Sequence, residues 1–366
     1  MCVACGREED EQRGVWRCAC GGVFDLAGAR PPLDPDAWAA GPATLARYEQ
    51  ALGLAVEGGE GKGFAAITMG EGFTPLVPVG AGDAGVLAKV DYLMPTLSFK
   101  DRGAVVLMSR AASLGVTRAV EDSSGNAGTA IAAYGARAGI AVEVFVPAST
   151  SPRKIRQIEW HGAVVQVVPG TREDVAIAAA AAVTAGEAWY ASHVYNPWFI
   201  EGTQTLAFEL WEQLGRRAPA TLVLPAGNGT LVLGAWRGFS RLAAAGLCSR
   251  RPAIVAVQAA ACAPLAEAFA AGLSQPASID PGPTAAEGVA VARPARGAQV
   301  LAAVAESGGR LISVGEEEIA TARVELARAG WFVEPTAALA WAGARVLGPA
   351  AEPVVVVLGG AGLKAD

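Results

Sequence analysis

Residues 95–103 read Pro-Thr-Leu-Ser-Phe-Lys-Asp-Arg-Gly, and they decide how the rest of the chain is interpreted. The stretch follows a strand-like apolar run, and residues 104–112 show helical periodicity, so Lys100 is predicted to stand at the start of a helix. The positive end of the helix dipole and the nearby Arg102 both disfavour the ammonium form of this lysine. A neutral amine is the form that attacks an aldehyde. Taken alone, the pattern also describes an ordinary surface lysine at a helix N-terminus.

Strand-like apolar runs alternate with Ala-rich helical stretches on either side of this motif, which favours an α/β fold with parallel sheets. The predicted strands lie at 85–90, 141–146, 163–168, 221–224, 254–257 and 354–358. Residues 30–42 are rich in Pro, Ala and Asp and are interpreted as a linker. At about 100–200 residues per domain, a chain of 366 residues is expected to form two domains.

The composition excludes several classes of protein. Hydrophobic residues make up 52% and charged residues 17%, which indicates a large core rather than disorder or a coiled coil. A net charge of −6 argues against a general nucleic-acid binder. No apolar run approaches the roughly 20 residues of a membrane span, and the first residues do not resemble a signal peptide. We therefore expect a cytoplasmic protein with no nucleic-acid or membrane partner.

A second motif, Glu-Asp-Ser-Ser-Gly-Asn-Ala-Gly at 121–128, lies between a predicted strand and a helix. Its hydroxyls and backbone N–H groups at a helix N-terminus form a ready site for a carboxylate. A capped helix preceded by a tight glycine turn explains the same residues equally well.

A third motif, Ala-Gly-Asn-Gly-Thr at 226–230, joins the predicted strand at 221–224 to a helical stretch at 231–239. Glycines let the backbone come close to a ligand, so several N–H groups can converge on a phosphate. A simple strand-to-helix turn is the alternative. The motif lacks the lysine of a nucleotide-binding P-loop.

Four cysteines crowd the first 20 residues, at positions Cys2, Cys5, Cys18 and Cys20. Two close pairs of thiolates suit tetrahedral, structural Zn²⁺. A metal-free knuckle and free thiols are the alternatives.

Several of these motifs together resemble the fold-type II pyridoxal-phosphate (PLP) enzymes of the tryptophan synthase β superfamily, and threonine synthases in particular. Residues 95–103 resemble the cofactor-lysine motif of that family, and Gly-Glu-Gly-Phe-Thr-Pro-Leu at 70–76 resembles the phrase near the start of its catalytic domain. Many threonine synthase-like sequences also begin with a cysteine-rich knuckle. The resemblance reaches from that knuckle to Lys364.

The resemblance implies a role for each matching residue. Lys100 would hold PLP as a Schiff base and act as the catalytic base. The residues that would contact the cofactor or a small amino-acid substrate are Asn126 at the ring hydroxyl, Gly227, Asn228, Gly229 and Thr230 at the phosphate, Gly359 beside the pyridine nitrogen, Ser123, Ser124 and the Ala127 backbone at the substrate carboxylate, and Thr96 and Phe199 elsewhere around the substrate.

The resemblance also implies the architecture. We expect two open, twisted, parallel-sheet α/β domains: a large PLP-binding domain made of residues 31–97 and 200–366, and a smaller domain made of residues 98–199 that carries the Ser-Ser-Gly-Asn loop. A zinc knuckle at residues 1–30 precedes them. Related enzymes are commonly dimers, so we expect a homodimer.

The chain departs from the threonine synthase pattern at several positions. Gly359 stands where those enzymes have a threonine that hydrogen-bonds the pyridine nitrogen. Phe199 and Gln204 stand where the phrase Asn-Pro-x-Arg-x-x-Gly-x-Lys-Thr supplies cations, and Met94 and Leu97 replace Asn and Gly in the lysine motif. Burying the second phosphate of O-phosphohomoserine without paired cations would be costly.

The leading hypothesis for the function is a PLP-dependent lyase that resembles threonine synthase and carries out β- or γ-elimination and replacement, with Lys100 moving the α-proton. One alternative is an ammonia-lyase or β-replacement enzyme that acts on a non-phosphorylated amino acid. Another is a catalytically silent protein that binds PLP and zinc and acts as an interaction module. Glu287 is interpreted either as an acid near the ring or as a solvated loop acid.

Overall fold

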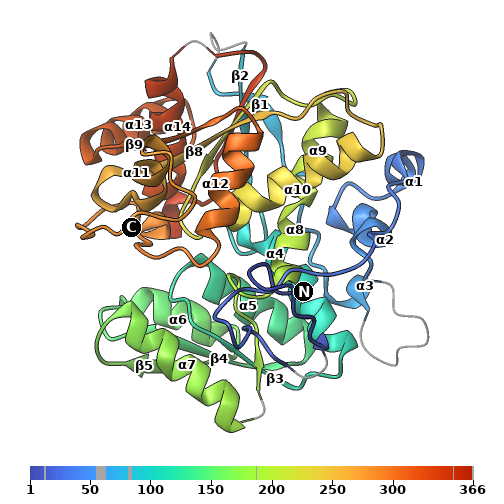
Figure 1. Ribbon diagram of the computed structural model, residues 1–366, viewed down its shortest axis with the longest axis vertical. Helices are drawn as coiled ribbons and strands as arrows, with labels where there is room; N and C mark the ends of the chain where they lie inside the picture. Colours follow the sequence, from blue (N-terminus) through green and yellow to red (C-terminus); the bar gives the residue numbers. More distant parts are fainter. Residues whose placement is uncertain (12–13, 55–62, 81–84, 187, 349, 365–366) are drawn as a thin grey trace. The chain divides into compact units, whose positions relative to one another are not determined.

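The computed structural model describes residues 1–11, 14–54, 63–80, 85–186, 188–348 and 350–364. These residues form two compact units. The first contains residues 1–71 and 100–202, and the second contains residues 72–99 and 203–366, within those described ranges. Both are α/β units (Figure 1).

The first unit is built on a four-stranded parallel sheet in the order β5-β4-β3-β6. Its strands are β3 (Arg118–Glu121), β4 (Ala141–Pro147), β5 (Val164–Val168) and β6 (Trp189–Tyr190). Its helices are α1 (Pro35–Ala40), η2 (Leu45–Tyr48), α2 (Glu49–Leu52), α3 (Phe64–Ile67), α4 (Lys100–Ser113), α5 (Asn126–Ala138), α6 (Pro152–Trp160), α7 (Arg172–Gly186) and α8 (Pro197–Thr203), the last of which ends at the boundary between the units.

Both faces of this sheet are covered, because alternate residues of its strands enter two different apolar cores. Ala119 and Val144 belong to a core with α4 and α5, whereas Val120 and Phe145 belong to a core with α7. Burial on both faces explains why the strands read as continuous apolar runs in the sequence.

The second unit is built on a six-stranded sheet in the order β1-β2-β10-β7-β8-β9. Its strands are β1 (Leu76–Pro78), β2 (Val86–Lys89), β7 (Thr221–Pro225), β8 (Ala253–Ala259), β9 (Arg310–Val314) and β10 (Val354–Val357). Its helices are α9 (Thr205–Gln213), α10 (Thr230–Ala244), η3 (Ala260–Cys262), α11 (Pro264–Ala270), η4 (Glu287–Val289), α12 (Gly297–Glu306), α13 (Glu316–Arg328), α14 (Pro335–Leu347) and η5 (Gly362–Lys364).

The expectation of purely parallel sheets is wrong at one edge of this second sheet. Strand β1 pairs with β2 in the antiparallel sense, with Leu76 opposite Lys89. Only a short connection separates the two strands, and a parallel crossover needs about a dozen residues or more. The other strand pairs of the sheet are parallel.

The segment at 30–42, interpreted as a linker, contains helix α1 instead. The Asp34 carboxylate caps this helix by accepting hydrogen bonds from the N–H groups of Asp36 and Ala37 at 3.2 and 3.0 Å. The Trp38 side chain is buried and meets Tyr48 edge to face, with ring centroids 5.0 Å apart. Residues 31–71 also belong to the first unit, whereas the sequence-based division placed them in the larger domain.

Candidate active site

Lys100 is the first residue of α4, as the sequence predicts. Its Nζ atom lies 5.8 Å from the centroid of the Phe199 ring, at the start of α8. The Phe199 side chain is fully buried and belongs to the core shared with α4 and α5. Gly103 makes this packing possible, because a Cβ atom on it would collide with the Phe199 ring. The lysine amine therefore lies beside a buried apolar ring.

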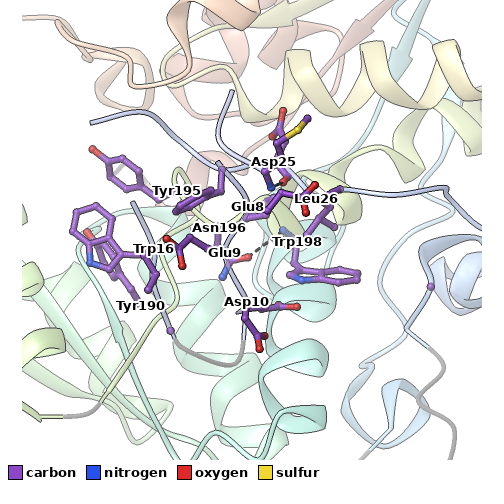
Figure 2. A pocket seen from close by; sticks show the side chains of 18 of the residues that line it. Glu8, Glu9, Asp10, Trp16, Asp25, Leu26, Tyr190, Tyr195, Asn196 and Trp198 are labelled. Atoms are coloured by element: carbon purple, nitrogen blue, oxygen red, sulfur yellow. Dashed lines mark hydrogen bonds between the residues drawn. The ribbon is translucent and has the colours of Figure 1, made fainter. Parts of the chain in front are cut away.

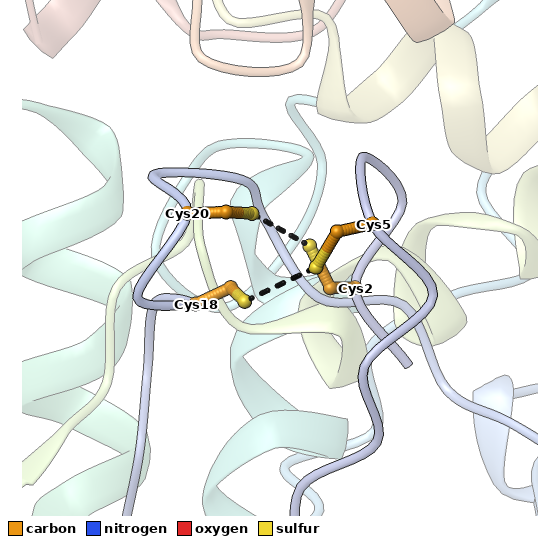
Figure 3. A group of neighbouring side chains, drawn as sticks. All are labelled: Cys2, Cys5, Cys18 and Cys20. Atoms are coloured by element: carbon orange, nitrogen blue, oxygen red, sulfur yellow. Dashed lines mark hydrogen bonds between the residues drawn. The ribbon is translucent and has the colours of Figure 1, made fainter.

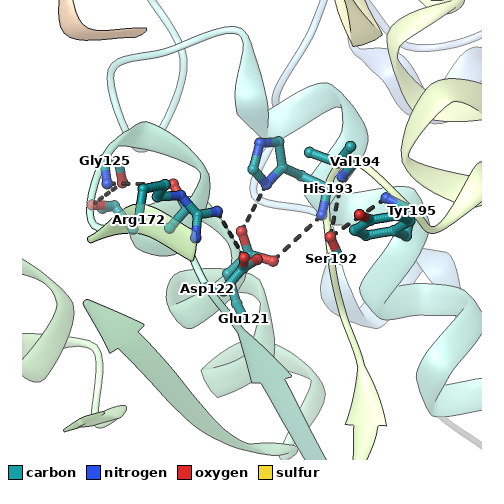
Figure 4. A network of polar contacts seen from close by, with 10 residues as sticks. Glu121, Asp122, Gly125, Arg172, Ser192, His193, Val194 and Tyr195 are labelled. Atoms are coloured by element: carbon teal, nitrogen blue, oxygen red, sulfur yellow. Dashed lines mark hydrogen bonds and ion pairs between the residues drawn. The ribbon is translucent and has the colours of Figure 1, made fainter. Parts of the chain in front are cut away.

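A network of polar groups, buried except for the exposed Arg172, lies at the end of β3 in the same unit (Figure 4). The Glu121 Oε1 atom is 2.7 Å from Nδ1 of His193, and the His193 backbone N–H donates to Oε2 at 3.4 Å. The next residue, Asp122, accepts a hydrogen bond from Nη2 of Arg172 at 2.7 Å. Two acids, a histidine and an arginine therefore meet where the Ser-Ser-Gly-Asn loop begins.

Burial governs the protonation of this network. It raises the pKa of the Glu121 carboxyl well above its usual range, and the nearby Asp122 carboxylate adds to the rise, while Arg172 and Lys100 oppose it. Burial also holds the pKa of His193 well below its usual value; the positive charges of Lys100 and Arg172 add to this effect, and Asp122 opposes it. Burial therefore disfavours the charged form of both groups.

The Ser-Ser-Gly-Asn loop leads directly from β3 into α5, which begins at Asn126. Gly125 occupies the N-cap position, and among the described residues no side chain caps this helix. The Gly125 carbonyl accepts the N–H of Thr129 at 3.2 Å, and Ala127 is buried in the first turn. The first N–H groups of a helix lack partners within the helix, so this end of α5 offers donors to an anion.

The predicted phosphate turn lies between β7 and α10 in the second unit. Within the described part of the chain, the backbone N–H groups of Gly227, Asn228 and Gly229 donate no hydrogen bond, and both glycines are buried. Gly229 has a φ of +80°, in the region that favours glycine, and it precedes Thr230, the first residue of α10. Buried donors without acceptors at a helix N-terminus fit a phosphate group, so these residues fit the phosphate of PLP.

Thr96 and Gly359 lie in the second unit, where the segment around Thr96 contacts the C-terminal segment around Gly359. The Thr96 carbonyl accepts a hydrogen bond from Nζ of Lys364 at 2.7 Å, and the Gly359 carbonyl accepts the N–H of Phe99 at 2.9 Å. A Cβ atom on Gly359 would lie 3.0 Å from the Phe99 ring, which leaves little room for the threonine of related enzymes. Leu97 has a φ of +62°, a conformation for which glycine, the usual residue of the motif, is better suited.

The four N-terminal cysteines come together, with all their sulfur atoms within 4.8 Å of one another (Figure 3). The Sγ atoms of Cys2 and Cys20 are 3.5 Å apart, and those of Cys5 and Cys18 are 3.6 Å apart. Burial opposes ionisation of Cys2, but hydrogen bonds from the backbone of Ala4 and Cys5 and from Cys20 lower its pKa to about 6. Four sulfur ligands at this spacing suit a tetrahedral metal site.

A cavity of about 460 Å³ lies between the N-terminal segment and the end of β6 (Figure 2). Its aromatic wall is formed by Trp16, whose ring meets those of Tyr190 and Tyr195 edge to face at 4.9 and 4.8 Å. Glu8 and Glu9 contribute carboxylates to its lining. The ring contacts of Trp16 show that the N-terminal segment packs near the end of β6, within the first unit.

The sequence analysis missed the pairing of Glu121 with His193 and of Asp122 with Arg172. In the sequence the two acids appear only as the start of the motif at 121–128, and His193 lies in none of the motifs. The only available signal was an acidic pair at the end of a buried strand. Glu287, interpreted either as an acid near the ring or as a solvated loop acid, is exposed in η4.

Comparison with known proteins agrees with this geometry. Residues 67–360 match the family described as "Pyridoxal-phosphate dependent enzyme". Curated relatives include the threonine synthase of Methanosarcina acetivorans, which is 31% identical over 94% of this chain and 86% of the relative, and that of Synechocystis sp., which is 34% identical over 81% of this chain and 78% of the relative.

Solved structures share the fold. Maize serine racemase superposes with a TM-score of 0.70 at 19% identity, covering 79% of this chain and 88% of that one. A threonine deaminase from T.th. superposes with a TM-score of 0.65 at 26% identity, covering 75% of this chain and 87% of that one.

The chain therefore belongs to the family of pyridoxal-phosphate dependent enzymes. It has the fold of the type II enzymes of that family, and the prediction of PLP as its cofactor is confirmed. It is a PLP-dependent lyase that resembles threonine synthase. Within the described residues, no helix has both the length and the apolar character needed to span a membrane.

Proposed function

We propose that this enzyme acts on a small amino acid by threonine synthase-type elimination and replacement, with Lys100 as the residue that binds PLP and moves the substrate's α-proton. The observation that carries the proposal is the position of Lys100 at the start of α4, with its amine against the buried Phe199 ring. Bound PLP would supply an electron-withdrawing ring that delocalises charge from the α-carbon. Removal and return of the proton would be the work of the Lys100 amine.

The other predicted residues would bind and orient. We assign the N–H groups of Gly227, Asn228, Gly229 and Thr230 to the cofactor phosphate, which is supported by their lack of acceptors within the described residues. We assign Asn126 to the ring hydroxyl, and Ser123, Ser124 and the Ala127 N–H to the substrate carboxylate. The start of α5 supports the carboxylate site, because the positive end of the helix dipole and the Ala127 N–H in its first turn favour an anion.

A second candidate is supported by two positions. Phe199 is fully buried where threonine synthases carry an arginine, and Gln204, where they carry a lysine, accepts a hydrogen bond from Arg241 at 3.1 Å. A site without the usual cations suits an amino acid without a phosphate, and Thr96 would then contact an uncharged side chain. This candidate is an ammonia-lyase or β-replacement enzyme. The interaction-module hypothesis is not favoured, because Lys100 and the phosphate turn are both intact.

A product screen tests the proposal. Purified, PLP-loaded protein is incubated with O-phosphohomoserine, serine, threonine and other β-substituted amino acids, with the Lys100→Ala variant as the control. Threonine and inorganic phosphate formed from O-phosphohomoserine would support the first candidate. A 2-oxo acid and ammonia formed from another amino acid, with no reaction of O-phosphohomoserine, would support the second. No turnover of any amino acid would contradict both.

We also propose that the four cysteines bind structural Zn²⁺ as a knuckle within residues 1–30. The convergence of the four sulfur atoms within 4.8 Å supports the site. A cytoplasmic location and a homodimer are further proposals that rest on the resemblance to threonine synthases, and size-exclusion chromatography with light scattering tests the dimer.

A further inference from the structure

Glu121 and His193 are held together by side-chain contacts and by a backbone hydrogen bond between their segments. The Glu121 side chain meets both the ring and the backbone N–H of His193, at 2.7 and 3.4 Å. The segment that carries His193 is tied to the same strand, because the Ala191 N–H donates to the Val120 carbonyl at 2.8 Å. His193 therefore has little freedom to move relative to β3.

His193 and Lys100 share one neighbour, the ring of Phe199. Its centroid lies 5.8 Å from that of Phe199, with the rings inclined at 68°, and Phe199 lies 5.8 Å from the Lys100 Nζ atom. The Phe199 ring thus neighbours both the imidazole and the amine, and it fills the space beside Gly103. A change in the orientation of His193 would shift the Phe199 ring, because side chains in a close-packed core cannot move independently.

The short contact between Glu121 and His193 requires a shared proton. An oxygen lone pair and a nitrogen lone pair would repel each other at 2.7 Å, so a proton must lie between Oε1 of Glu121 and Nδ1 of His193. If this were the only imidazole proton, Glu121 would be an ionised carboxylate in a fully buried position, which is unfavourable. The favoured arrangement places a second proton on Nε2, so that the pair as a whole is neutral.

We propose that Glu121 and His193 are positioning residues for the Lys100 amine: their shared proton fixes the His193 ring, which holds Phe199 against the amine. The inference rests on the proposed role of Lys100. The charged and titratable groups that act on the pair are Lys100 on α4, Asp122 after β3, Tyr190 on β6 and Arg172 on α7. Arg172 is engaged with Asp122.

The test compares Glu121→Gln with Glu121→Leu in the full-length protein. The Gln amide can donate to Nδ1 and keep the ring in place, whereas Leu leaves Nδ1 without a partner. The readout is the pH midpoint of the visible absorbance band of the PLP-loaded protein. The Phe199 ring stabilises a positive charge on the Lys100 nitrogen and so raises the midpoint. Glu121→Leu, which releases the His193 ring, is expected to lower the midpoint by about half a pH unit, while Glu121→Gln keeps the native value. Glu143→Leu, which removes the Arg118 ion pair on neighbouring β4, is the matched control and is expected to leave it unchanged.

A second readout needs no cofactor. The chain contains two histidines, so ¹⁵N spectra of the imidazoles are simple, and His161→Asn assigns the signals of His193. The inference predicts that Nε2 is protonated in the native protein and in Glu121→Gln. It would be overturned by an unprotonated Nε2, by a folded Glu121→Leu protein with the native midpoint, or by equal shifts in the Gln and Leu variants. If native protein shows no visible band with PLP, the proposed role of Lys100 fails, and the imidazole spectra still decide the state of the pair.

Discussion

The substitution Gly229→Ala tests the phosphate turn most sharply. Gly229 has a φ of +80°, and an alanine in this left-handed region costs roughly 1–2 kcal/mol. The added Cβ atom would also collide with a methyl group of Val300 on α12, and overpacking of this kind costs about 1–3 kcal/mol. The turn can relieve this strain only by rotating its backbone, which moves the N–H groups of Gly227 and Asn228 away from a common point.

The chain offers a matched control for this change. Gly246 follows the other end of α10 and has a φ of +71°, but a Cβ atom there meets nothing within 4 Å. Gly246→Ala is expected to lose roughly 1–2 kcal/mol of stability and keep its affinity for PLP. Gly229→Ala is expected to bind PLP at least about tenfold more weakly, which corresponds to about 1.4 kcal/mol.

The assay is a titration of apoprotein with PLP, followed by visible absorbance, after circular dichroism has shown that each variant is folded. A folded Gly229→Ala protein with native affinity would refute the assignment of this turn to the phosphate. An equal loss of affinity in Gly246→Ala would show that general destabilisation, and not the turn, is responsible.

Three further predictions concern stability and metal binding. Glu209→Gln is expected to lower the free energy of unfolding by about 3–5 kcal/mol in denaturant titrations, because it removes the negative charge that lies 2.8 Å from the fully buried Lys89 ammonium. Burial raises the pKa of Glu121 and lowers that of His193 in the folded state, so their effects on stability oppose each other between about pH 4.3 and 6.5; as the pH rises above about 6.5, native protein should lose up to roughly 1.4 kcal/mol per pH unit until the folded Glu121 carboxyl ionises, and Glu121→Gln should lose less. Cys20→Ser should lose bound zinc in elemental analysis, while Cys248→Ser, at a buried cysteine outside the cluster, should retain it.

The central strands were predictable from the sequence because they are buried on both faces. Runs such as 221–224 and 354–358 lie in β7 and β10 at the centre of the larger sheet, where no polar residue interrupts the pattern. Strand β9 was not predicted, because its exposed and buried residues follow no clear period, and its pattern begins with the exposed Arg310. The antiparallel strand β1 was not predicted, because a strand of three residues is too short to show an alternating or continuous apolar pattern.

The residues around Lys100 were only partly predictable. The motifs at 95–103, 121–128 and 226–230 are local, so each could be recognised from adjacent residues. Glu121 and His193 are separated by 72 positions, and no spacing rule links them. Phe199 was expected to bind substrate because of its place in a family phrase, but whether a ring at this position packs in the core depends on Gly103, which lies in a different helix.

The central claim is that Lys100 binds PLP, and borohydride reduction of the PLP-loaded protein followed by peptide mass spectrometry tests it most directly. Reduction makes the bond between the cofactor and a lysine permanent, so the modified residue can be located. The account predicts a pyridoxyl group on Lys100 and none in the Lys100→Ala variant. Modification of another lysine instead, such as the buried Lys89 or Lys154 on α6, would contradict it.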